Sequence, residues 1–369
     1  MDVHMTHLET QPVWVPQHGG PDTGGVPLFD FSTNSNACGP CAEAREAVQS
    51  ADATRYPDPA YTALREGLGA FHGVAPGRIV LAASASEFMH RFTALAAQQG
   101  AVQVALPTHS YGDYAQAAQV RGLGVVRGNG AAAGLQWACE PSSPLGLADP
   151  AVRAWQHDGA ERGGDVANVL RVLDCAYAPL RLDPEGAWTG VPPAQLPATC
   201  WQLWTPNKAL GLTGVRAAYA IAPAGSEELV RALAALAPSW PVGAHGVALL
   251  QAWVLPVVQQ WLVYSLSTLR DWKSRQQALC LDLGWAVHAG SLANYFCAQP
   301  VGTSLPDDLV ALRTAGIKLR DATSFGLPGS VRLGVLAPTA QDALRQAWRT
   351  IESSRTIANR NSTGSGDAL

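Results

Sequence analysis

The stretch CWQLWTPNKALGLTGVRAAYAI, residues 200–221, holds a single lysine between two apolar runs that are typical of buried strands. Lys208 lies three residues after the hydroxyl of Thr205 and eight residues before the guanidinium of Arg216. The amine can form a Schiff base and the other two groups can hold a dianion, which suits an aldehyde cofactor carrying a phosphate. A lysine between apolar strands is costly unless it is used, so we favour this function over a surface lysine in a glycine-rich loop.

A second apolar run, residues 168–173, ends in Asp174, and Tyr177 follows three residues later. We expect a buried parallel strand here, and open α/β sheets bind ligands at the carboxyl ends of such strands. Pyridoxal phosphate is an electron sink only while its ring nitrogen is protonated, which requires a neighbouring carboxylate. We assign Asp174 to that nitrogen and Tyr177 to the phenolic oxygen of the ring. Alone, Asp174 would suit a helix or turn cap, and its register with Lys208 and Arg216 favours the functional assignment.

A helix N-terminus is the expected site for the cofactor phosphate. Residues 78–82 predict a strand, after which Ser84, Ala85 and Ser86 open an amphipathic helix. The free amides of that first turn and its two hydroxyls form an anion site. The signal is weak by itself, because a serine followed by Glu87 also caps helices that bind no ligand.

Several further motifs extend this pattern along the chain. They are FSTNSN at 31–36, RYPD at 55–58, the loop 107–114, LRDATSFGLP at 319–328 and VRLGV at 331–335. With them the chain resembles, from about Phe31 to about Trp348, a fold-type I pyridoxal-phosphate enzyme of the class I/II aminotransferase superfamily. The resemblance is to the branch that holds histidinol-phosphate aminotransferases and threonine-phosphate decarboxylases.

The resemblance implies roles for side chains around the cofactor. The tyrosine of the Arg-Tyr-Pro-Asp motif crosses the dimer interface in the family to the neighbouring subunit's cofactor phosphate, which gives this role to Tyr56. The loop 107–114 supplies an aromatic ring over the pyridine, for which we choose Tyr111 with His109 as the alternative. Asn36 of the N-terminal motif is expected to contact the substrate.

Two arginines are candidates for substrate recognition. The family's closing motif carries a strand arginine that grips the substrate α-carboxylate, which implies this role for Arg332, and lysine would not replace its two-donor fork. Arg320 suits a distal anionic group of a phosphorylated substrate and a surface ion pair equally well.

Trp240 suits a wall of the substrate pocket and plain packing equally well. Ser143 stands where the family usually has an asparagine under the phenolic oxygen, so the tuning of the cofactor differs here.

The spacing of apolar runs predicts an α/β fold. Expected strands alternate with helices, which indicates a mostly parallel sheet with helices on both faces and a smaller α+β domain beside it. The expected large-domain strands are residues 78–82, 101–106, 135–138, 168–173, 200–204 and 217–221, and the small domain would include strands at 291–297 and 331–335. We divide the chain into an N-terminal arm with part of the small domain (1–50), a large cofactor-binding domain (51–274), a small C-terminal domain (275–352) and a flexible tail (353–369).

The composition predicts a weakly charged protein that buries much of its surface. Of 369 residues 47% are hydrophobic and 15% charged, which suits a subunit interface, and the net charge of -4 suggests neither nucleic acid nor an anionic membrane as a partner. Residues 1–27 lack a signal-peptide pattern, so we expect a cytoplasmic enzyme. Residues 232–269 contain no Asp, Glu, Lys or Arg, but prolines interrupt the run, so we expect a buried interdomain or dimer helix rather than a membrane span.

The tetrapeptide Cys38-Gly39-Pro40-Cys41 copies the redox motif of thioredoxins. Such a motif should follow a strand and open a helix that lowers the thiol pKa, whereas Asn34 to Asn36 before it predict a turn, so we expect a chance resemblance. The seven cysteines are expected to be reduced and mostly buried, and their spacing predicts no zinc or other metal site.

Together these features predict a homodimeric pyridoxal-phosphate enzyme that transfers an amino group from a small-molecule donor to a 2-oxo acid acceptor. Lys208 would carry the cofactor as a Schiff base and then move the proton from the substrate Cα. A decarboxylase of the threonine-phosphate type would use the same site, and the sequence does not fix which Cα bond is broken. A cofactor-binding sensor and a thiol–disulfide oxidoreductase built on Cys38 and Cys41 are the alternatives from other classes.

Overall fold

A seven-stranded sheet in the order β2-β8-β7-β6-β5-β3-β4 forms the centre of the larger part of the molecule. The computed structural model describes residues 18–128, 130, 132–161, 169–193, 196–302 and 304–363. The strands run parallel except for β8, which is antiparallel to both of its neighbours. They are β2 (Ile79–Ala82), β3 (Gln103–Leu106), β4 (Gly124–Arg127), β5 (Leu135–Cys139), β6 (Leu170–Asp174), β7 (Trp201–Trp204) and β8 (Ala218–Ile221).

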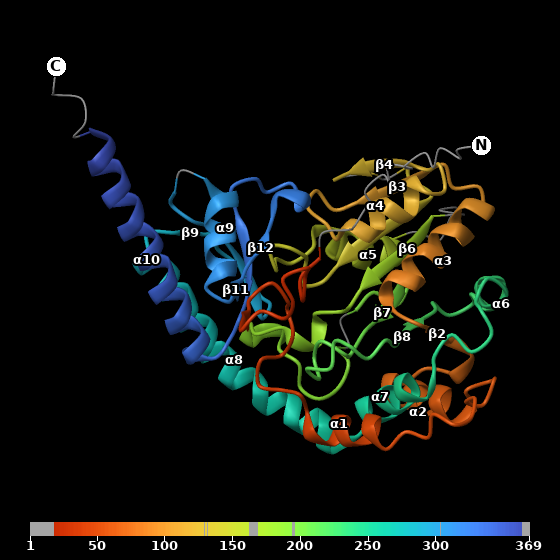
Figure 1. Cartoon of the computed structure of the whole chain (residues 1–369). Helices are drawn as coiled ribbons and strands as arrows, with labels where there is room; N and C mark the ends of the chain where they lie inside the picture. Colours follow the sequence, from red (N-terminus) through yellow and green to blue (C-terminus); the bar gives the residue numbers. More distant parts are fainter. Residues whose placement is uncertain are drawn as a thin grey trace, which may run out of the picture.

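Helices cover both faces of this sheet, as predicted (Figure 1). Side chains alternate along each strand, so Val80 and Ala82 enter one core while Ile79 and Leu81 enter the other. The first core packs against α3 (Ala85–Gln98), α4 (Gly112–Gln119) and α6 (Glu227–Ala235). The second packs against α1 (Ala42–Gln49), α2 (Thr62–His72), α5 (Pro150–Glu161), α7 (Ala244–Trp253) and α8 (Pro256–Asp282).

The strands expected from apolar runs coincide with β2, β3, β5, β6, β7 and β8 within two residues at each end. These strands are buried on both faces, which gives them the continuous apolar runs on which the prediction rested. Residue 168, the expected start of β6, lies outside the described residues. The edge strand β4 is not among the six expected large-domain strands, because its residues are partly exposed and it lacks such a long apolar run.

A smaller part of the molecule has its own four-stranded antiparallel sheet in the order β12-β13-β10-β9. A separate hydrophobic core fills it, with Trp285 and Trp348 packed edge to face. β1 pairs with β11 in parallel and so joins N-terminal residues to this part. Its elements are β1 (Phe29–Asp30), β9 (Ala286–Val287), β10 (Tyr295–Gln299), α9 (Leu305–Thr314), β11 (Ile317–Lys318), β12 (Arg320–Asp321), β13 (Val331–Gly334) and α10 (Pro338–Thr363).

One prediction for this smaller part was wrong in detail. The strand expected at 291–297 begins only at Tyr295, whose carbonyl accepts a hydrogen bond from the Ser291 hydroxyl in the preceding turn. Residues 353–363 are helical and continue α10, and the flexibility expected of the tail stays a prediction. Residues 364–369 lie outside the described part of the chain.

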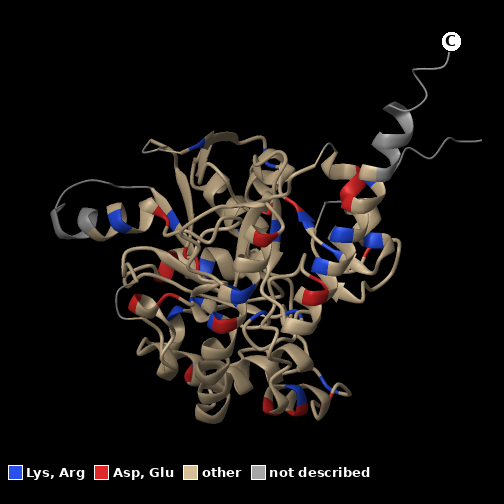
Figure 2. Ribbon diagram, turned by 90° about the vertical axis from the view of Figure 1, so that its left-hand side faces the viewer, with Lys and Arg blue, Asp and Glu red and all other residues tan. Residues whose placement is uncertain are grey.

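The long helix α8 connects the two parts, as predicted for the stretch after Pro241. Leu269 belongs to the core of the larger part and Leu279 to that of the smaller one, and the domain boundary at residue 274 stays a prediction between them. α7 and α8 contain most of residues 232–269, the run that has no Asp, Glu, Lys or Arg. Charged residues of both signs are also sparse in the rest of the chain (Figure 2). Over the described chain no single helix is long and apolar enough to cross a membrane; α7 and α8 pass that test only as a pair bent by 72°.

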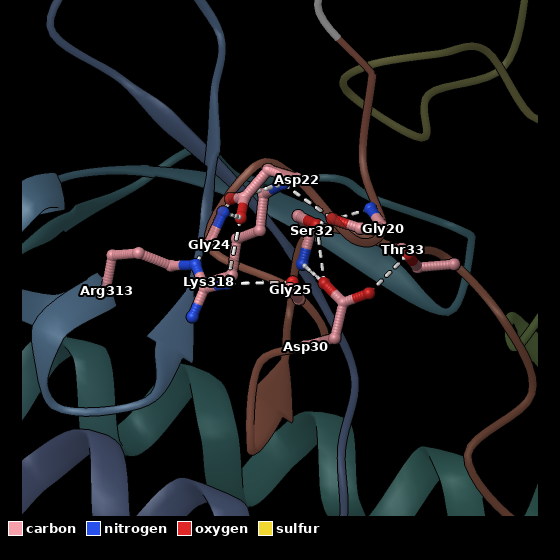
Figure 3. Close-up of polar contacts among 9 residues, drawn as sticks. All are labelled: Gly20, Asp22, Gly24, Gly25, Asp30, Ser32, Thr33, Arg313 and Lys318. Atoms are coloured by element: carbon pink, nitrogen blue, oxygen red, sulfur yellow. Dashed lines mark hydrogen bonds and ion pairs between the residues drawn. The ribbon is translucent and has the colours of Figure 1, made fainter.

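The residues before β1 are fastened to the smaller part by a group that we call the N-terminal clamp, made of Asp22, Arg313 and Lys318 (Figure 3). Arg313 donates to both carboxylate oxygens of Asp22, at 2.8 and 3.1 Å, and the Lys318 amine lies 2.9 Å from this carboxylate. The same cations bind the carbonyls of Gly25 and Gly20. Arg313 first and Lys318 next lower the pKa of Asp22 far below its usual value, so the carboxylate stays charged.

Hydrogen bonds next to the clamp hold two N-terminal stretches against each other. The Gly20 amide donates to the Ser32 hydroxyl at 2.9 Å, and Asp30 accepts hydrogen bonds from the Ser32 amide and the Thr33 hydroxyl. As a result Gly20 lies beside Ser32 and Thr33 (Figure 3). The first residues that the structure describes therefore line the cavity presented in the next subsection.

We predict that Asp22→Asn loosens this N-terminal segment, because an amide cannot neutralise two cations. Limited proteolysis followed by mass spectrometry should show several-fold faster cleavage within residues 18–30. The matched control is Asp342→Asn, which removes a carboxylate paired with Arg275 and Arg345 elsewhere on the surface. Equal cleavage of the Asp22 variant and the wild type would show that the clamp does not hold the segment.

Candidate active site

A cavity of about 590 Å³ lies where the strand ends of the large sheet face the smaller part. Asp174 ends β6, while Thr205 follows β7 and Ser84 follows β2, so these residues share one edge of the sheet. Arg320 and Arg332 reach the cavity from β12 and β13 on the other side. Predicted residues that line it are Ser84, Ala85, Ser86, Tyr111, Ser143, Asp174, Tyr177, Thr205, Lys208, Arg216, Arg320 and Arg332.

Lys208 is the lysine that faces this cavity. The chain has only three lysines, Lys208, Lys273 and Lys318. Lys273 is buried and donates to the carbonyls of Ser291 and Ala293, and Lys318 belongs to the N-terminal clamp. The Lys208 amine lies 5.2 Å from the centre of the Tyr177 ring, in the cavity wall. An amine available to a ligand is therefore found at the predicted position.

Asp174 is a buried carboxylate held from two sides. One oxygen accepts from the Tyr114 hydroxyl at 2.6 Å and the other from the Ala176 amide at 2.9 Å. Burial raises the pKa of Asp174, while the hydrogen bonds from Tyr114 and Ala176 and the charge of Lys208 oppose that rise. A buried anion that borders a cavity is suited to a cationic group of a ligand.

The amide that lines the cavity beside Tyr177 is Asn34, and the prediction for Asn36 was wrong. Asn34 donates to the Tyr177 hydroxyl at 3.2 Å. Asn36 is buried outside the cavity, where its side-chain amide donates to the carbonyl of Ala209 and the hydroxyl of Ser265. Its hydrogen bonds hold the turn that follows β1, so they are not available to a substrate.

One end of the cavity is equipped for a dianion. The first turn of α3 points here with Ser84, whose hydroxyl caps the helix by accepting from the Glu87 amide at 3.1 Å. The buried Thr205 hydroxyl has no hydrogen-bond partner among the described residues, although such groups are normally satisfied. Arg216 adds a guanidinium to the same wall. An unpartnered hydroxyl, a cation and a helix N-terminus together fit a phosphate group.

The smaller part of the molecule contributes two buried guanidinium groups to the cavity lining. Arg320 and Arg332 are 6% and 7% exposed, so neither side chain lies at the surface. They lie opposite each other in β12 and β13 and flank the Phe325 ring, at 4.7 and 5.3 Å from its centre. Burial, and then the charge of Arg332, lower the pKa of Arg320 to about 10, which leaves it charged at neutral pH.

Arg332 retains a free donor for a ligand. One of its terminal nitrogens donates to the Ser32 carbonyl at 3.0 Å, and the other to the Ser143 hydroxyl at 3.4 Å. Its Nε is buried and has no partner in the part of the chain that the structure describes. The Ser143 hydroxyl therefore contacts Arg332, a contact that the sequence did not predict.

The aromatic ring that lines the cavity is Tyr111 rather than His109. Tyr111 packs edge to face against Tyr114, with ring centres 6.0 Å apart, and the His18 ring lies 5.9 Å away. His109 instead contacts the carbonyl of Phe325 through Nδ1 at 2.9 Å and does not line the cavity. Of the two candidates for stacking on a bound ring, the structure favours Tyr111.

Tyr56 and Trp240 lie outside the cavity of their own chain. Tyr56 is 78% exposed and stacks on Trp240, with ring centres 4.4 Å apart. The Trp240 indole donates to the carbonyl of Pro57 at 3.0 Å. Of the two alternatives for Trp240, a wall of the pocket and plain packing, packing is the one observed within this chain.

The paired cysteines do not resemble a redox centre. Burial raises the pKa of the Cys38 thiol to about 11 and also raises that of Cys41, whereas a redox-active thiol needs a lowered pKa. Among the residues described, no group of three or more His, Cys, Asp or Glu side chains could hold a metal ion.

Sequence reasoning missed Tyr114, Ala176 and Asn34, which also line the cavity. Ala176 was open to prediction, because it lies two residues after Asp174 in the same strand-end loop. Tyr114 was not, because its place on α4 gives it the spacing of an ordinary core residue.

The sequence of this chain is similar to those of known aminotransferases. The family model "Aminotransferase class I and II" matches residues 166–351. A histidinol-phosphate aminotransferase of Rhodospirillum rubrum is 27% identical over 84% of this chain and 86% of its own length. An aromatic amino acid aminotransferase of Rhodococcus jostii is 28% identical over 95% of this chain and 96% of its own.

Solved structures share the fold. The histidinol-phosphate aminotransferase of Sinorhizobium meliloti, in complex with pyridoxal-5'-phosphate, has a TM-score of 0.72 and 20% identity over 89% of this chain and 92% of its own. The L-threonine-O-3-phosphate decarboxylase of Porphyromonas gingivalis has a TM-score of 0.69 and 17% identity, covering 88% of this chain and all of its own. At these identities the likeness extends to the fold alone.

The residues of the cavity fit the cofactor of this family. An available lysine amine, a buried carboxylate and an unpartnered hydroxyl beside a helix N-terminus match an aldehyde, a ring nitrogen and a phosphate. The chain therefore belongs to the class I and II aminotransferases, a family of enzymes that depend on pyridoxal phosphate.

Proposed function

We propose that this enzyme transfers an amino group from an anionic, amino-acid-like donor to a 2-oxo acid, with the cofactor attached at Lys208. The observation that carries the proposal is one cavity lined by Lys208 and Asp174 on one side and by Arg320 and Arg332 on the other. A covalent centre and a pair of cations in one cavity suit a substrate that brings its own negative charge.

Each cavity residue has a distinct task in this proposal. When bound, pyridoxal phosphate supplies an electron sink for the charge that develops at the donor Cα. Lys208 would bond the cofactor and, once displaced by the donor amine, would move the proton that leaves Cα. Asp174 would hold the protonated ring nitrogen, and Tyr177 would donate a hydrogen bond to the phenolic oxygen of the ring. Tyr111 would pack against the ring.

The remaining residues divide between the phosphate and the substrate. Thr205, Arg216 and the first turn of α3, including Ser86, would hold the cofactor phosphate. Arg332 would take the α-carboxylate or an equivalent anion, using its unpartnered Nε. Arg320 would meet a second anion, which agrees with relatives named for a phosphorylated substrate.

The Lys208→Ala variant should lose turnover while keeping its fold, because this amine provides both the cofactor bond and the proton transfer. We would follow amino transfer from a panel of donors to a 2-oxo acid, together with the cofactor absorption and circular dichroism. Lys318→Arg, which removes a lysine outside the cavity, is the control.

Near-normal activity of Lys208→Ala with an unchanged cofactor spectrum would refute the proposal. Release of carbon dioxide by the wild type without a 2-oxo acid would instead assign the site to decarboxylation. Transamination requires the acceptor, so the two reactions separate cleanly.

Arg332→Lys should raise KM for carboxylate or phosphate donors roughly 10- to 100-fold, because lysine has no Nε–H donor at this position and the hydrogen bond to the anion is lost. Arg320→Lys should do so only for donors with a second anionic group. Arg275→Lys, at a surface ion pair, is the control. If KM rises equally for a neutral analogue of the donor, the two arginines do not recognise the negative charge of the donor.

We also propose a homodimer in which Tyr56 serves the partner subunit's cofactor phosphate. Its exposure at the surface, stacked on Trp240, supports a role outside its own cavity. Tyr56→Phe and Lys208→Ala subunits, each impaired alone, should regain activity when mixed, because one site of the mixed dimer has both residues. No gain on mixing, despite subunit exchange, would place Tyr56 in another role.

A cytoplasmic location is proposed from the thiols. All seven cysteines are free, and six of them are buried. Such reduced thiols suit a reducing compartment.

A further inference from the structure

The side chain of Tyr114, which contacts the Asp174 carboxylate, is fixed by close packing. Tyr114 lies on α4 and is 1% exposed, with its hydroxyl 2.6 Å from the Asp174 carboxylate. Its ring stacks on Trp137, with centres 4.9 Å apart and planes at 18°, and meets Tyr111 edge to face. Packing on two sides leaves the hydroxyl one direction, toward the carboxylate.

We propose that Tyr114 is a positioning residue, which orients the Asp174 carboxylate and keeps it ionised for the cofactor's ring nitrogen. The inference rests on the proposed role of Asp174. It assigns to α4 a task that neither the sequence motifs nor the family match contained.

The geometry specifies the ionised form of Asp174. Both carboxylate oxygens accept hydrogen bonds, one from the Tyr114 hydroxyl and one from the Ala176 amide. The distance of 2.6 Å falls in the range of O–H···O bonds to a charged acceptor. A neutral carboxyl group would present one weaker acceptor to these two donors, so the surroundings stabilise the anion against the cost of its burial.

The Tyr114 phenol and the neighbouring thiols are all protonated, so the tyrosine is a hydrogen-bond donor to Asp174. Burial raises the pKa of the Tyr114 phenol well above its usual value, and the pKa values of the Cys139 and Cys175 thiols are raised in the same way. All three groups are therefore neutral near pH 7, and the tyrosine can only donate to the carboxylate. Lys208 is the cation that acts on Asp174 from the cavity side.

A purely structural role would need the ring but not the hydroxyl, so Tyr114→Phe separates the two. We expect equilibrium affinity for pyridoxal phosphate, measured by absorbance and fluorescence titration, to fall roughly 10- to 100-fold, as for a lost hydrogen bond to a charged group. The pH below which affinity drops should also rise, because the carboxylate protonates more readily. Tyr61→Phe is the control, since this buried phenol donates to the Val242 carbonyl away from the cavity.

A double-mutant cycle tests whether Tyr114 acts through Asp174. In an Asp174→Asn background, Tyr114→Phe should cost no further affinity, whereas independent roles would add. Full affinity and an unshifted pH profile in Tyr114→Phe would overturn the inference while leaving the proposed function standing. Failure of the wild type to bind the cofactor would overturn both.

A measurement on the folded wild type keeps the inference testable if Tyr114→Phe does not fold. A short hydrogen bond to a carboxylate should give a proton resonance downfield of the amide region. That resonance should disappear in Asp174→Asn. Its absence from the wild type, or its survival in that variant, would contradict the contact.

Discussion

The charge of Asp174 at the buried end of β6 is the constraint on which the rest of the site depends. A carboxylate this deep survives as an anion only with donors behind it and a cation in front. The Tyr114 hydroxyl and the Ala176 amide supply the donors. The parallel neighbour β7 leads to Lys208, so the sheet order itself brings a cation to the same cavity.

The two parts of the molecule contribute different chemistry to the cavity. The large sheet supplies the amine, the carboxylate and the groups that suit a dianion, from strand ends and loops at one sheet edge. The smaller sheet supplies Arg320 and Arg332, which are held in register on paired strands and share the Phe325 ring. Lys318 of the N-terminal clamp binds the carbonyl of Gly20, and the Gly20 amide donates to the hydroxyl of Ser32. The carbonyl of Ser32 in turn accepts a hydrogen bond from Arg332, so the contacts of this arginine are linked to the N-terminal segment.

The sequence predicted what depends on local pattern. Lys208 and Asp174 follow apolar runs whose ends share a sheet edge, and the structure places both in the cavity. Tyr114 escaped prediction because its contact with Asp174 joins residues 60 positions apart. Asn34 was missed and Asn36 expected in the site, because a motif does not show which way a turn directs its amides. The sequence left Trp240 between two roles for a related reason: aromatic residues near a pocket and on a surface look alike in sequence.

The central claim is that one lysine carries the cofactor. Borohydride reduction of the enzyme loaded with pyridoxal phosphate, followed by proteolysis and mass spectrometry, tests it most directly because the chain has only three lysines. The account predicts the added mass on the peptide that contains Lys208. Added mass on Lys273 or Lys318 alone, or on no lysine, would contradict it.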